Sequence, residues 1–379
     1  YRRHYGNYEY VINIYDLWNR QEKVNVSVRR SEPEFYFKKA LNWSATTMGG
    51  SSFRITNNKT SSTAAPSLYF KNDDDLYVSL ALLNSCISQV YMDLLNPTVG
   101  LKLANVEAVP AINFEKMAVF LRSSCENNIA LSKEDWDSYE ISWDFEQHPL
   151  VKRKELHSLE KCYLTWKTEC ENRFLKMKDN EEHINVVILK EYGLENEVSC
   201  EVPEKSISVH RIFDTKEDIP VSMDGSYYVR TKRDEIVSLI SYSVGCMFGR
   251  YSLDKKGIVN AGAPLNVNEY VSFSVDKDNI IPICDDEYFK DDIVGRFVEF
   301  IKIVYGADSL DDNLTFIAKA LGGKGSPREI IRNYFVNDFY KEHCATYSGT
   351  VGKRPIYWLF DAGKNNSFKA LIYMHRYQP

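Results

Sequence analysis

The feature that most constrains the fold is a long amphipathic segment near the middle of the chain. Its apolar side chains recur at steps of three and four residues, so they share one face of an α-helix. They are Leu156, Leu159, Tyr163, Trp166, Cys170 and Phe174. The pattern predicts a helix of roughly 35 residues, which is long for a globular domain. Such a helix either holds two domains apart or forms one side of a helical bundle.

The segment before this helix favours strands. Four short runs combine period-2 alternation with aromatic and β-branched residues: YEYVINI, VNVSVRR, FYFKKALNWS and SLYF. Residues 76–95 then show apolar residues at helical spacing after the acidic NDDD, which suits a helix start. LKLANVEAVPAI is expected to leave this part as another extended segment. Residues 1–125 are therefore expected to form a mostly β or mixed domain.

The segment after the long helix is richer in helical patterns. Four of them follow one another between residues 233 and 347, and one begins with Ser326, Pro327 and Glu329, a typical capping sequence. The chain ends in two extended runs, RPIYWLF and FKALIYMHRY, joined by the turn-forming DAGKNNS, which predicts a β-hairpin. The predicted fold class is α+β. Its parts are a domain over 1–125, a helical spacer over 126–192 and an α-rich domain over 193–379.

Composition excludes several classes of protein. With 379 residues, 44% of them hydrophobic, the chain is long enough to bury a substantial core. The eight Cys form no CxxC pair, so neither a zinc site nor a disulfide framework is indicated, and reduced thiols are expected. No apolar run has the length of a membrane span and no signal segment opens the chain, so we expect a soluble, cytoplasmic protein. Because a strand pattern follows Tyr1 almost at once, an upstream domain is also expected.

The net charge of -6 conceals a marked polarity along the chain. Residues 1–60 carry +5 and residues 319–379 carry +6, so the middle carries -17. Basic ends around an acidic middle favour a polyanion-binding surface built from the two ends. Ordinary variation in surface charge produces the same distribution, and this alternative stays open.

A search for catalytic motifs finds none. No strand is followed by the GxG turn that binds S-adenosylmethionine. The sequence closest to the Asn/Asp-Pro-Pro-aromatic motif of adenine methyltransferases begins at Asn96 and continues as Pro-Thr-Val, which predicts a helix stop. The GGKGS run at 322–326 lacks phosphate-loop spacing, although Lys324 could touch a DNA phosphate. We therefore predict no catalytic, cofactor-binding or metal-binding residue in this segment.

Recognition chemistry is better represented than catalysis. The run FYFKKALNWSATTMGGSSFR places Lys38, Lys39 and Arg54 around hydroxyl groups and beside Trp43. Those hydroxyls belong to Ser44, Thr46, Thr47, Ser51 and Ser52. Lys and Arg can bind phosphates or guanine edges, and Ser and Thr can contact either. An ordinary surface hairpin has a similar composition, so the residues alone leave DNA contact open.

The same phrases resemble known proteins. YRRHYGNYEYVINI, FYFKKALNWS, APSLYF and VEAVPAI resemble the target-recognition domain of fused restriction-modification methyltransferases. YEISWDFEQHPL, SYSVGCMFGRYSLD, GSPREIIRNYF and KRPIYWLFDAGKNNSFKALIYMHRY are similar to one branch, the PglX family of adenine-specific DNA methyltransferases of the BREX phage-exclusion system. The resemblance covers nearly the whole chain and places it in the C-terminal part of that family, after the catalytic half.

The resemblance implies several expectations. The parent enzyme would methylate adenine at a specific site to separate self from phage DNA, with S-adenosylmethionine bound in an N-terminal catalytic domain. Residues 36–54 would read bases, while Arg2, Arg3, Lys38 and Lys39 would hold phosphates. The C-terminal hairpin, with Lys353 and Arg354 beside it, would close over the duplex or buttress the catalytic domain; as an alternative, its aromatic residues belong to the core.

Expected partners are double-stranded DNA, the catalytic domain of the same protein and other BREX proteins. Two alternatives stay open. In one, the acidic middle is a protein-interaction module that docks defence-system partners or a DNA-mimicking phage inhibitor. In the other, the chain is the specificity half of a fused restriction-modification enzyme.

Overall fold

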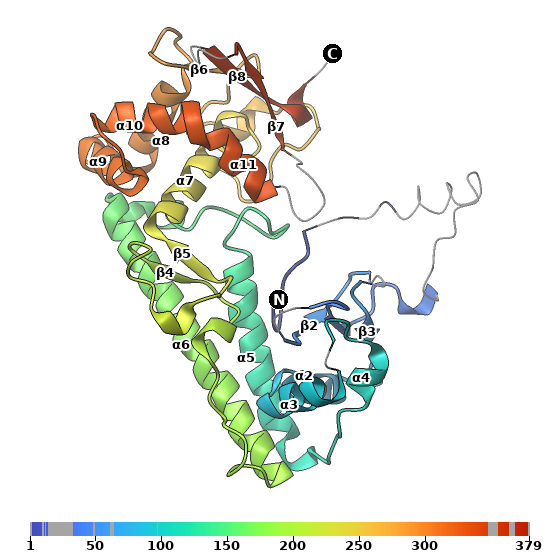
Figure 1. Cartoon of the computed structure of the whole chain (residues 1–379). Helices are drawn as coiled ribbons and strands as arrows, with labels where there is room; N and C mark the ends of the chain where they lie inside the picture. The colour runs from blue at the N-terminus through green and yellow to red at the C-terminus, as the bar shows by residue number, and fades with distance from the viewer. Residues whose placement is uncertain are drawn as a thin grey trace. The chain divides into compact units, whose positions relative to one another are not determined.

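The computed structural model describes residues 2–9, 11, 13, 33–47, 50–60, 64–96, 98–347, 355–363 and 368–377. It combines helices with small sheets (Figure 1), which confirms the predicted α+β class. The chain forms two compact units. Unit 1 comprises Tyr1–Trp136, Asn172–His210 and Pro220–Tyr228, and unit 2 comprises Asp137–Glu171, Arg211–Ile219 and Val229–Pro379.

The long amphipathic segment forms one helix, α6 (Leu159–Tyr192). Its first part belongs to unit 2 and its second part, from Asn172 on, belongs to unit 1. The boundaries at 125 and 192 expected from the sequence stay predictions. A helix of this length has two stretches of apolar face, and each stretch is buried in a different core.

Unit 1 contains a small antiparallel sheet and helices packed beside it. The strands are β1 (Ala40–Trp43), β2 (Phe53–Thr56) and β3 (Ser67–Leu68), in the order β2-β1-β3. The helices are α2 (Asp73–Asn84), α3 (Cys86–Leu95), α4 (Leu103–Glu107) and α5 (Ala118–Trp136). Every residue of β1 and β2 is buried, so this sheet lies inside the unit. Of the other predicted strands, VNVSVRR lies outside the described residues.

Two local predictions in unit 1 need correction. Residues 76–95 were expected to form one helix, but the chain breaks at Ser85 and the axes of α2 and α3 differ by 69°. The break is stabilised because the Ser85 side chain accepts a hydrogen bond from the Ser88 amide and so caps α3. The segment LKLANVEAVPAI was expected to be extended, but Leu103–Glu107 forms α4.

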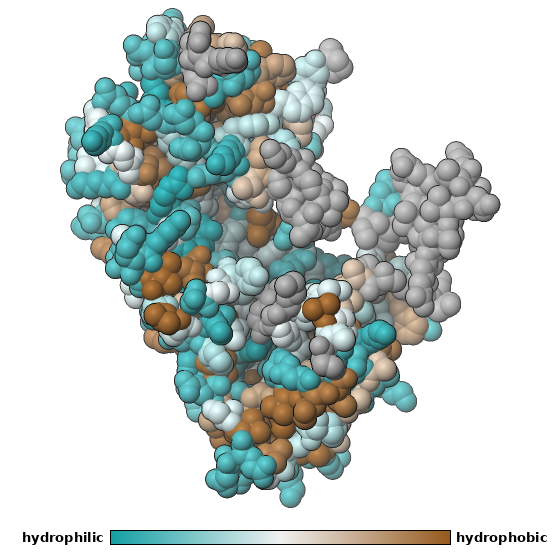
Figure 2. All heavy atoms as spheres, viewed as in Figure 1, coloured by the Kyte–Doolittle hydropathy of each residue, from teal (hydrophilic) through white to brown (hydrophobic). Residues whose placement is uncertain are grey.

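In the part of the chain that the structure describes, no single helix has the length and apolar character needed to cross a membrane. By length and composition alone, the bent pair of α2 and α3 meets that test. Much of the pair lies in the core of unit 1, where Leu80, Leu83 and Ile87 are buried. Hydrophobic side chains also remain at the surface over these helices and over the C-terminal sheet (Figure 2).

Unit 2 is mainly helical. Its helices are α7 (Lys232–Met247), α8 (Ile293–Tyr305), α9 (Leu310–Leu321), α10 (Pro327–Tyr334), the π-helix η7 (Phe335–Phe339) and α11 (Tyr340–Tyr347). Among the described residues, the 3₁₀ turns of both units are η1 (Pro33–Phe35), η2 (Glu115–Met117), η3 (Val151–Leu156), η4 (Glu204–Ser206), η5 (Val221–Met223), η6 (Val267–Glu269) and η8 (Met374–Arg376). The four helical patterns predicted after residue 232 are thus confirmed.

The described residues of unit 2 form two small sheets. β4 (Arg211–Phe213) and β5 (Val229–Thr231) pair in parallel. The predicted C-terminal hairpin is confirmed as β7 (Tyr357–Asp361) and β8 (Phe368–Tyr373), which pair antiparallel. A strand far away in the sequence, β6 (Ile280–Cys284), pairs with β8 and completes a sheet in the order β6-β8-β7.

The core of unit 2 also contains charged groups with matched partners. The Trp166 indole N–H on α6 donates to Glu235 Oε2 on α7 at 2.9 Å, and Arg230 pairs with the other oxygen of this carboxylate. Glu235 is fully buried, so both partners are needed to offset the cost of taking its charge out of water. These contacts join the start of α6 to α7 within unit 2.

Candidate nucleic-acid interface

The predicted recognition segment lies in unit 1 and is centred on the connection between β1 and β2. We call residues 44–52 the recognition loop; residues 48 and 49 lie outside the described residues. The loop is tied to the chain after α3, because the Thr47 amide donates to the Val99 carbonyl at 2.9 Å and the Leu101 amide donates to the Ala45 carbonyl at 2.8 Å. The first part of the loop, from Ala45 to Thr47, is therefore fixed by backbone hydrogen bonds.

The five predicted hydroxyl groups do not share one environment. Thr46 is exposed and Ser44 is half-buried, while Ser51 and Ser52 are buried. The half-buried Thr47 hydroxyl donates to the Gly50 carbonyl at 2.8 Å and closes the loop on itself. Thr46 and Ser44 are thus the hydroxyls best placed to meet a ligand.

Two predicted contact residues lie inside unit 1. Trp43 is fully buried, packs against Phe53 and donates its indole N–H to the Leu101 carbonyl at 3.0 Å. Arg54 is 7% exposed, and its Nη1 has no hydrogen-bond partner among the described residues. Burial lowers the pKa of Arg54, with the neighbouring Arg2 acting in the same direction. Neither side chain can reach a groove of DNA without a local opening of this unit.

The two predicted lysines differ in their surroundings. Lys38 is exposed, with its ammonium group 5.9 Å from the centre of the Phe35 ring. Lys39 forms an ion pair with Asp73 at 2.7 Å and lies over the Tyr77 ring. Burial opposes the charge of Lys39, but its hydrogen bonds to Asp73 and Tyr77 outweigh this and raise its pKa. Lys38 therefore presents a more available charge than Lys39.

Lys324 lies in unit 2, in the turn between α9 and α10. Gly322, Gly323 and Gly325 in this turn adopt positive φ angles of 77°, 119° and 126°, which favour glycine. The exposed Lys324 lines a small hollow of about 120 Å³ together with Arg233 and Tyr334.

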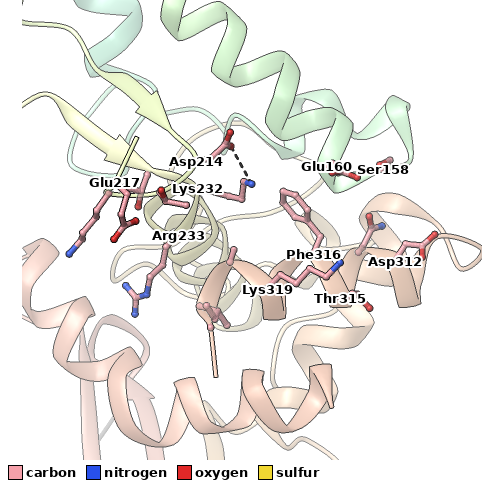
Figure 3. A pocket seen from close by; sticks show the side chains of 17 residues that line it. Ser158, Glu160, Asp214, Glu217, Lys232, Arg233, Asp312, Thr315, Phe316 and Lys319 are labelled. Carbon is pink, nitrogen blue, oxygen red and sulfur yellow. Dashed lines mark ion pairs between the residues drawn. The ribbon is translucent and has the colours of Figure 1, made fainter. Parts of the chain in front are cut away.

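A larger hollow of about 1020 Å³ adjoins it and shares Arg233 (Figure 3). Its acidic and basic side chains are equal in number. The basic side chains are Lys216, Lys232, Arg233 and Lys319, and the acidic ones are Glu160, Asp214, Glu217 and Asp312. Because the charges balance, this hollow lacks the excess of positive charge that selects a polyanion.

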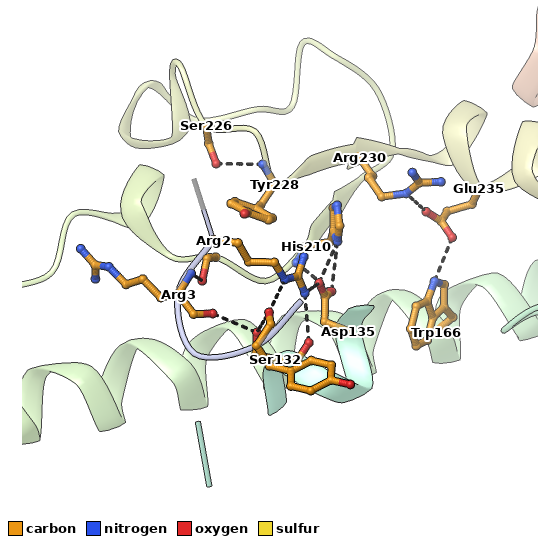
Figure 4. Close-up of polar contacts among 12 residues, drawn as sticks. Arg2, Arg3, Ser132, Asp135, Trp166, His210, Ser226, Tyr228, Arg230 and Glu235 are labelled. Carbon is orange, nitrogen blue, oxygen red and sulfur yellow. Dashed lines mark hydrogen bonds and ion pairs between the residues drawn. The ribbon is translucent and has the colours of Figure 1, made fainter. Parts of the chain in front are cut away.

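Arg2 and Arg3 each form an ion pair inside unit 1. Figure 4 shows the pair that Arg2 forms with Asp135. Arg2 is 2% exposed and its guanidinium contacts Asp135 at 2.8 Å, while His210 Nδ1 contacts the same carboxylate at 2.9 Å. Burial acts to raise the pKa of Asp135, but His210 and Arg2 outweigh it and hold this pKa far below its usual range. The charge of Arg2 is thus neutralised inside the unit.

Arg3 pairs with the buried Glu181 at 2.6 Å, and His4 contacts the other oxygen of the same carboxylate at 2.9 Å. The two pairs fasten residues 2–4 to α5 and α6. The remaining predicted residues, Lys353 and Arg354, lie outside the described residues. The structure therefore groups Lys38, Lys39 and the recognition loop in unit 1 and places Lys324 in unit 2.

Sequence reasoning missed the residues that position the recognition loop. The Asn84 side chain accepts from the Phe53 amide and donates to the Phe53 carbonyl, both at 2.9 Å, so it extends the sheet like an additional strand residue. Gln89 accepts from the amide and hydroxyl of Ser51 at 3.3 and 3.4 Å. Neither residue belongs to a local motif, and each is more than 30 positions from its partner.

Comparison with known proteins identifies relatives over the whole chain. The chain is 36% identical over 396 residues to the adenine-specific methyltransferase PglX of Lacticaseibacillus casei (strain Zhang). The chain is a relative of PglX. It is also 31% identical over 393 residues to the adenine-specific methyltransferase BrxX of Escherichia coli O9:H4 (strain HS). These matches confirm the resemblance to PglX found in the sequence, and no family model matches the chain.

The matches cover 100% and 99% of this chain but only 31% of PglX and of BrxX. The chain thus spans just under a third of the length of these relatives. What is shown is a relationship to adenine-specific methyltransferases along every part of the chain.

Proposed function

We propose that this chain is the DNA sequence-recognition part of a site-specific adenine-N6 DNA methyltransferase that separates self from phage DNA in a BREX-type system. The observation that carries the proposal is the match of the entire chain to just under a third of PglX and of BrxX. Methyl transfer and S-adenosylmethionine binding are assigned to the remaining two thirds of such an enzyme, because this sequence lacks both motifs.

Unit 1 is proposed to make the DNA contacts. Lys38 and Lys39 approach phosphates next to the recognition loop, where Thr46 and Ser44 can contact base edges or sugar oxygens. The loop is suited to this role because hydrogen bonds to Val99 and Leu101 hold the start of its backbone, so less conformational freedom is lost on binding. Phosphate contacts supply affinity that depends on salt, and base contacts supply about 1–3 kcal/mol each for good bidentate pairs.

The proposal includes partners and location. The partners are double-stranded DNA, the catalytic region of the same methyltransferase and other BREX proteins, all in the cytoplasm. The alternative of a fused restriction-modification enzyme has the same recognition part but requires a nuclease motif in the region beyond this chain. Endonuclease assays on the full-length protein with unmethylated DNA separate these two versions.

The test is a segment swap in cells that carry the full-length methyltransferase. Residues 36–60 are exchanged for the matching segment of a relative with a different target, and modified adenines are mapped by sequencing. We expect the methylated site to change while methylation itself continues. A control swap of the exposed segment 261–269 in unit 2 should leave the site unchanged. An unaltered target after the first swap would refute the recognition role.

A further inference from the structure

The outer face of the C-terminal sheet is apolar. Side chains alternate between the two faces of a strand, so the register divides this sheet into an inner and an outer set. Most of the inner set, including Ile281, Leu371 and Tyr357, belongs to the core of unit 2. The outer set is Ile280, Pro282 and Cys284 of β6, Phe368, Ala370 and Ile372 of β8, and Trp358 and Phe360 of β7. No charged side chain occurs in the outer set.

Large side chains of this face remain open to solvent. Trp358 is 41% exposed and Phe360 is 54% exposed. Phe368 is 40% exposed and meets Phe289 of the loop before α8, with ring centres 6.1 Å apart. Tyr377 extends the face beyond Trp358, with the centres of the two rings 5.3 Å apart. An exposed aromatic patch of this kind is typical of an interaction site, because a soluble surface rarely exposes contiguous apolar groups without a function.

The border of the face is acidic on the β6 side. Residues 276–292, which contain β6 and the loop after it, carry seven carboxylates and two lysines. Asp285, Asp286 and Glu287 are exposed directly after β6, and burial together with the neighbouring Asp278 raises the pKa of Asp276 to about 6. Of the seven carboxylates, Asp292 is neutralised by Arg332 at 2.8 Å. This border therefore keeps an excess of negative charge.

These charges select among the possible occupants. Aromatic side chains on a sheet can stack nucleic-acid bases, but the acidic border would repel phosphates. A second copy of this chain facing the same patch would bring the two acidic borders together, which is unfavourable in a two-fold contact. An acidic DNA mimic is disfavoured for the same reason. The face fits a protein surface with an apolar centre and Lys or Arg side chains opposite residues 285–287.

We propose that this outer face is the docking surface for the remaining region of the methyltransferase, the two thirds by which PglX and BrxX exceed this chain. The inference rests on the proposed function, because it requires a catalytic region in the same protein. A covalently linked region has a high effective concentration, so even a patch of modest area is kept occupied. The acidic border then selects the orientation in which basic groups of that region face residues 285–287.

The test is hydroxyl-radical footprinting read by mass spectrometry, on this chain and on the full-length methyltransferase. In the full-length protein we expect Trp358, Phe360 and Phe368 to oxidise about fivefold more slowly than in this chain, because the centre of an interface excludes water like a protein interior. The internal control is Tyr227, which is 81% exposed in unit 1 and should oxidise equally in both proteins. Equal oxidation of Trp358 in the two proteins would overturn the proposal.

Two further arms distinguish other occupants in this chain alone. Protection of Trp358 that appears when single-stranded or duplex DNA is added would make the face a nucleic-acid site and overturn the proposal. Protection that grows with the concentration of this chain would make it a contact between copies, with the same consequence. None of these readouts depends on methylation. An unprotected face would therefore not contradict the recognition role. Likewise, an unchanged target after the segment swap would not contradict the docking result.

Variants of the full-length protein test the two parts of the surface. Phe360→Ser with Phe368→Ser should restore fast oxidation of Trp358, whereas Val271→Ser, a matched change at an 80% exposed position of unit 2, should not. Asp285→Lys with Asp286→Lys should also speed the oxidation of Trp358, because it places like charges opposite the basic partner. Protection that survives both double variants would contradict the assignment.

Discussion

At the scale of single residues, unit 1 depends on charges that are buried in matched groups. Asp135 is fully buried and accepts from Arg2, from the His210 ring and from the His210 amide. Each partner alone would be costly to bury, and together they offset the loss of hydration. Since Arg2 and His210 are 208 positions apart, the carboxylate joins the start of the chain to its middle.

Removing that carboxylate should destabilise unit 1. Asp135→Asn leaves Arg2 buried without a counter-charge, and we expect the free energy of unfolding to fall by about 3 kcal/mol. Urea unfolding followed by circular dichroism measures the change. The control is Asp74→Asn, which breaks the exposed pair with Arg122 and should leave stability almost unaltered. Equal losses of unfolding free energy in the two variants would show that the buried network stabilises unit 1 no more than the exposed pair does.

Two histidines of unit 2 should make its stability depend on pH. Burial, helped by the nearby Arg230, lowers the pKa of His148 to about 3, and burial with Arg250 lowers the pKa of His343 to about 3. Both rings use a nitrogen as acceptor, His148 from the Leu150 amide and His343 from the Ile356 amide. The folded state therefore holds these rings neutral, while the unfolded chain protonates them near their ordinary pKa.

Between about pH 6.5 and 3 the unfolded state then binds more protons than the folded state, so stability is full above this window and is lost as pH falls through it. His343→Gln keeps an acceptor and should reduce the slope of unfolding free energy against pH by about 1.4 kcal/mol per pH unit in that window. Urea titrations at several pH values measure the slope, with the exposed His183→Gln as the matched control. An unaltered slope for His343→Gln would contradict the prediction.

At the scale of elements, the start of α10 shows how a local signal sets a helix. The Ser326 hydroxyl accepts from the Glu329 amide and the Glu329 carboxylate accepts from the Ser326 amide, which completes a capping box with Pro327 at the first position. Ser326→Ala should lower the unfolding free energy by about 1 kcal/mol, while Ser326→Asp, which preserves an acceptor, should retain most of it. Thermal unfolding of both variants tests this, and equal losses would disprove the role of the cap.

Local signals of this kind were enough to predict α7 to α10, the terminal hairpin and the α+β class from the sequence. Contacts between distant residues were not predictable. β6 joins β8 across more than 80 positions, and the Ser85 break between α2 and α3 depends on a hydroxyl that a continuous helical pattern conceals. The same holds for the candidate site. Its basic and hydroxyl residues could be found from local composition, but the burial of Trp43 and Arg2 depends on distant partners such as Leu101 and Asp135.

At the scale of the whole molecule, the charge polarity along the chain has two different outcomes. In the basic N-terminal segment, ion pairs neutralise Arg2, Arg3 and Lys39. Lys38, in contrast, is exposed. In the acidic middle, residues 285–287 remain at the surface. The net charge counts all of these side chains equally, but we expect the few exposed ones to contribute most to DNA binding.

This difference can be measured as the salt dependence of DNA binding by the full-length methyltransferase. Each phosphate neutralised adds about 0.9 to the slope of log affinity against log salt, so Lys38→Ala should reduce the slope by about 1. Lys39→Ala should reduce it less, because Asp73 at 2.7 Å already neutralises this lysine. Lys161→Ala, an exposed position of α6 in unit 2, is the control and should have no effect. A larger effect of Lys39 than of Lys38 would mean that the Asp73 pair opens on binding, and no effect of either would place the phosphate contacts elsewhere.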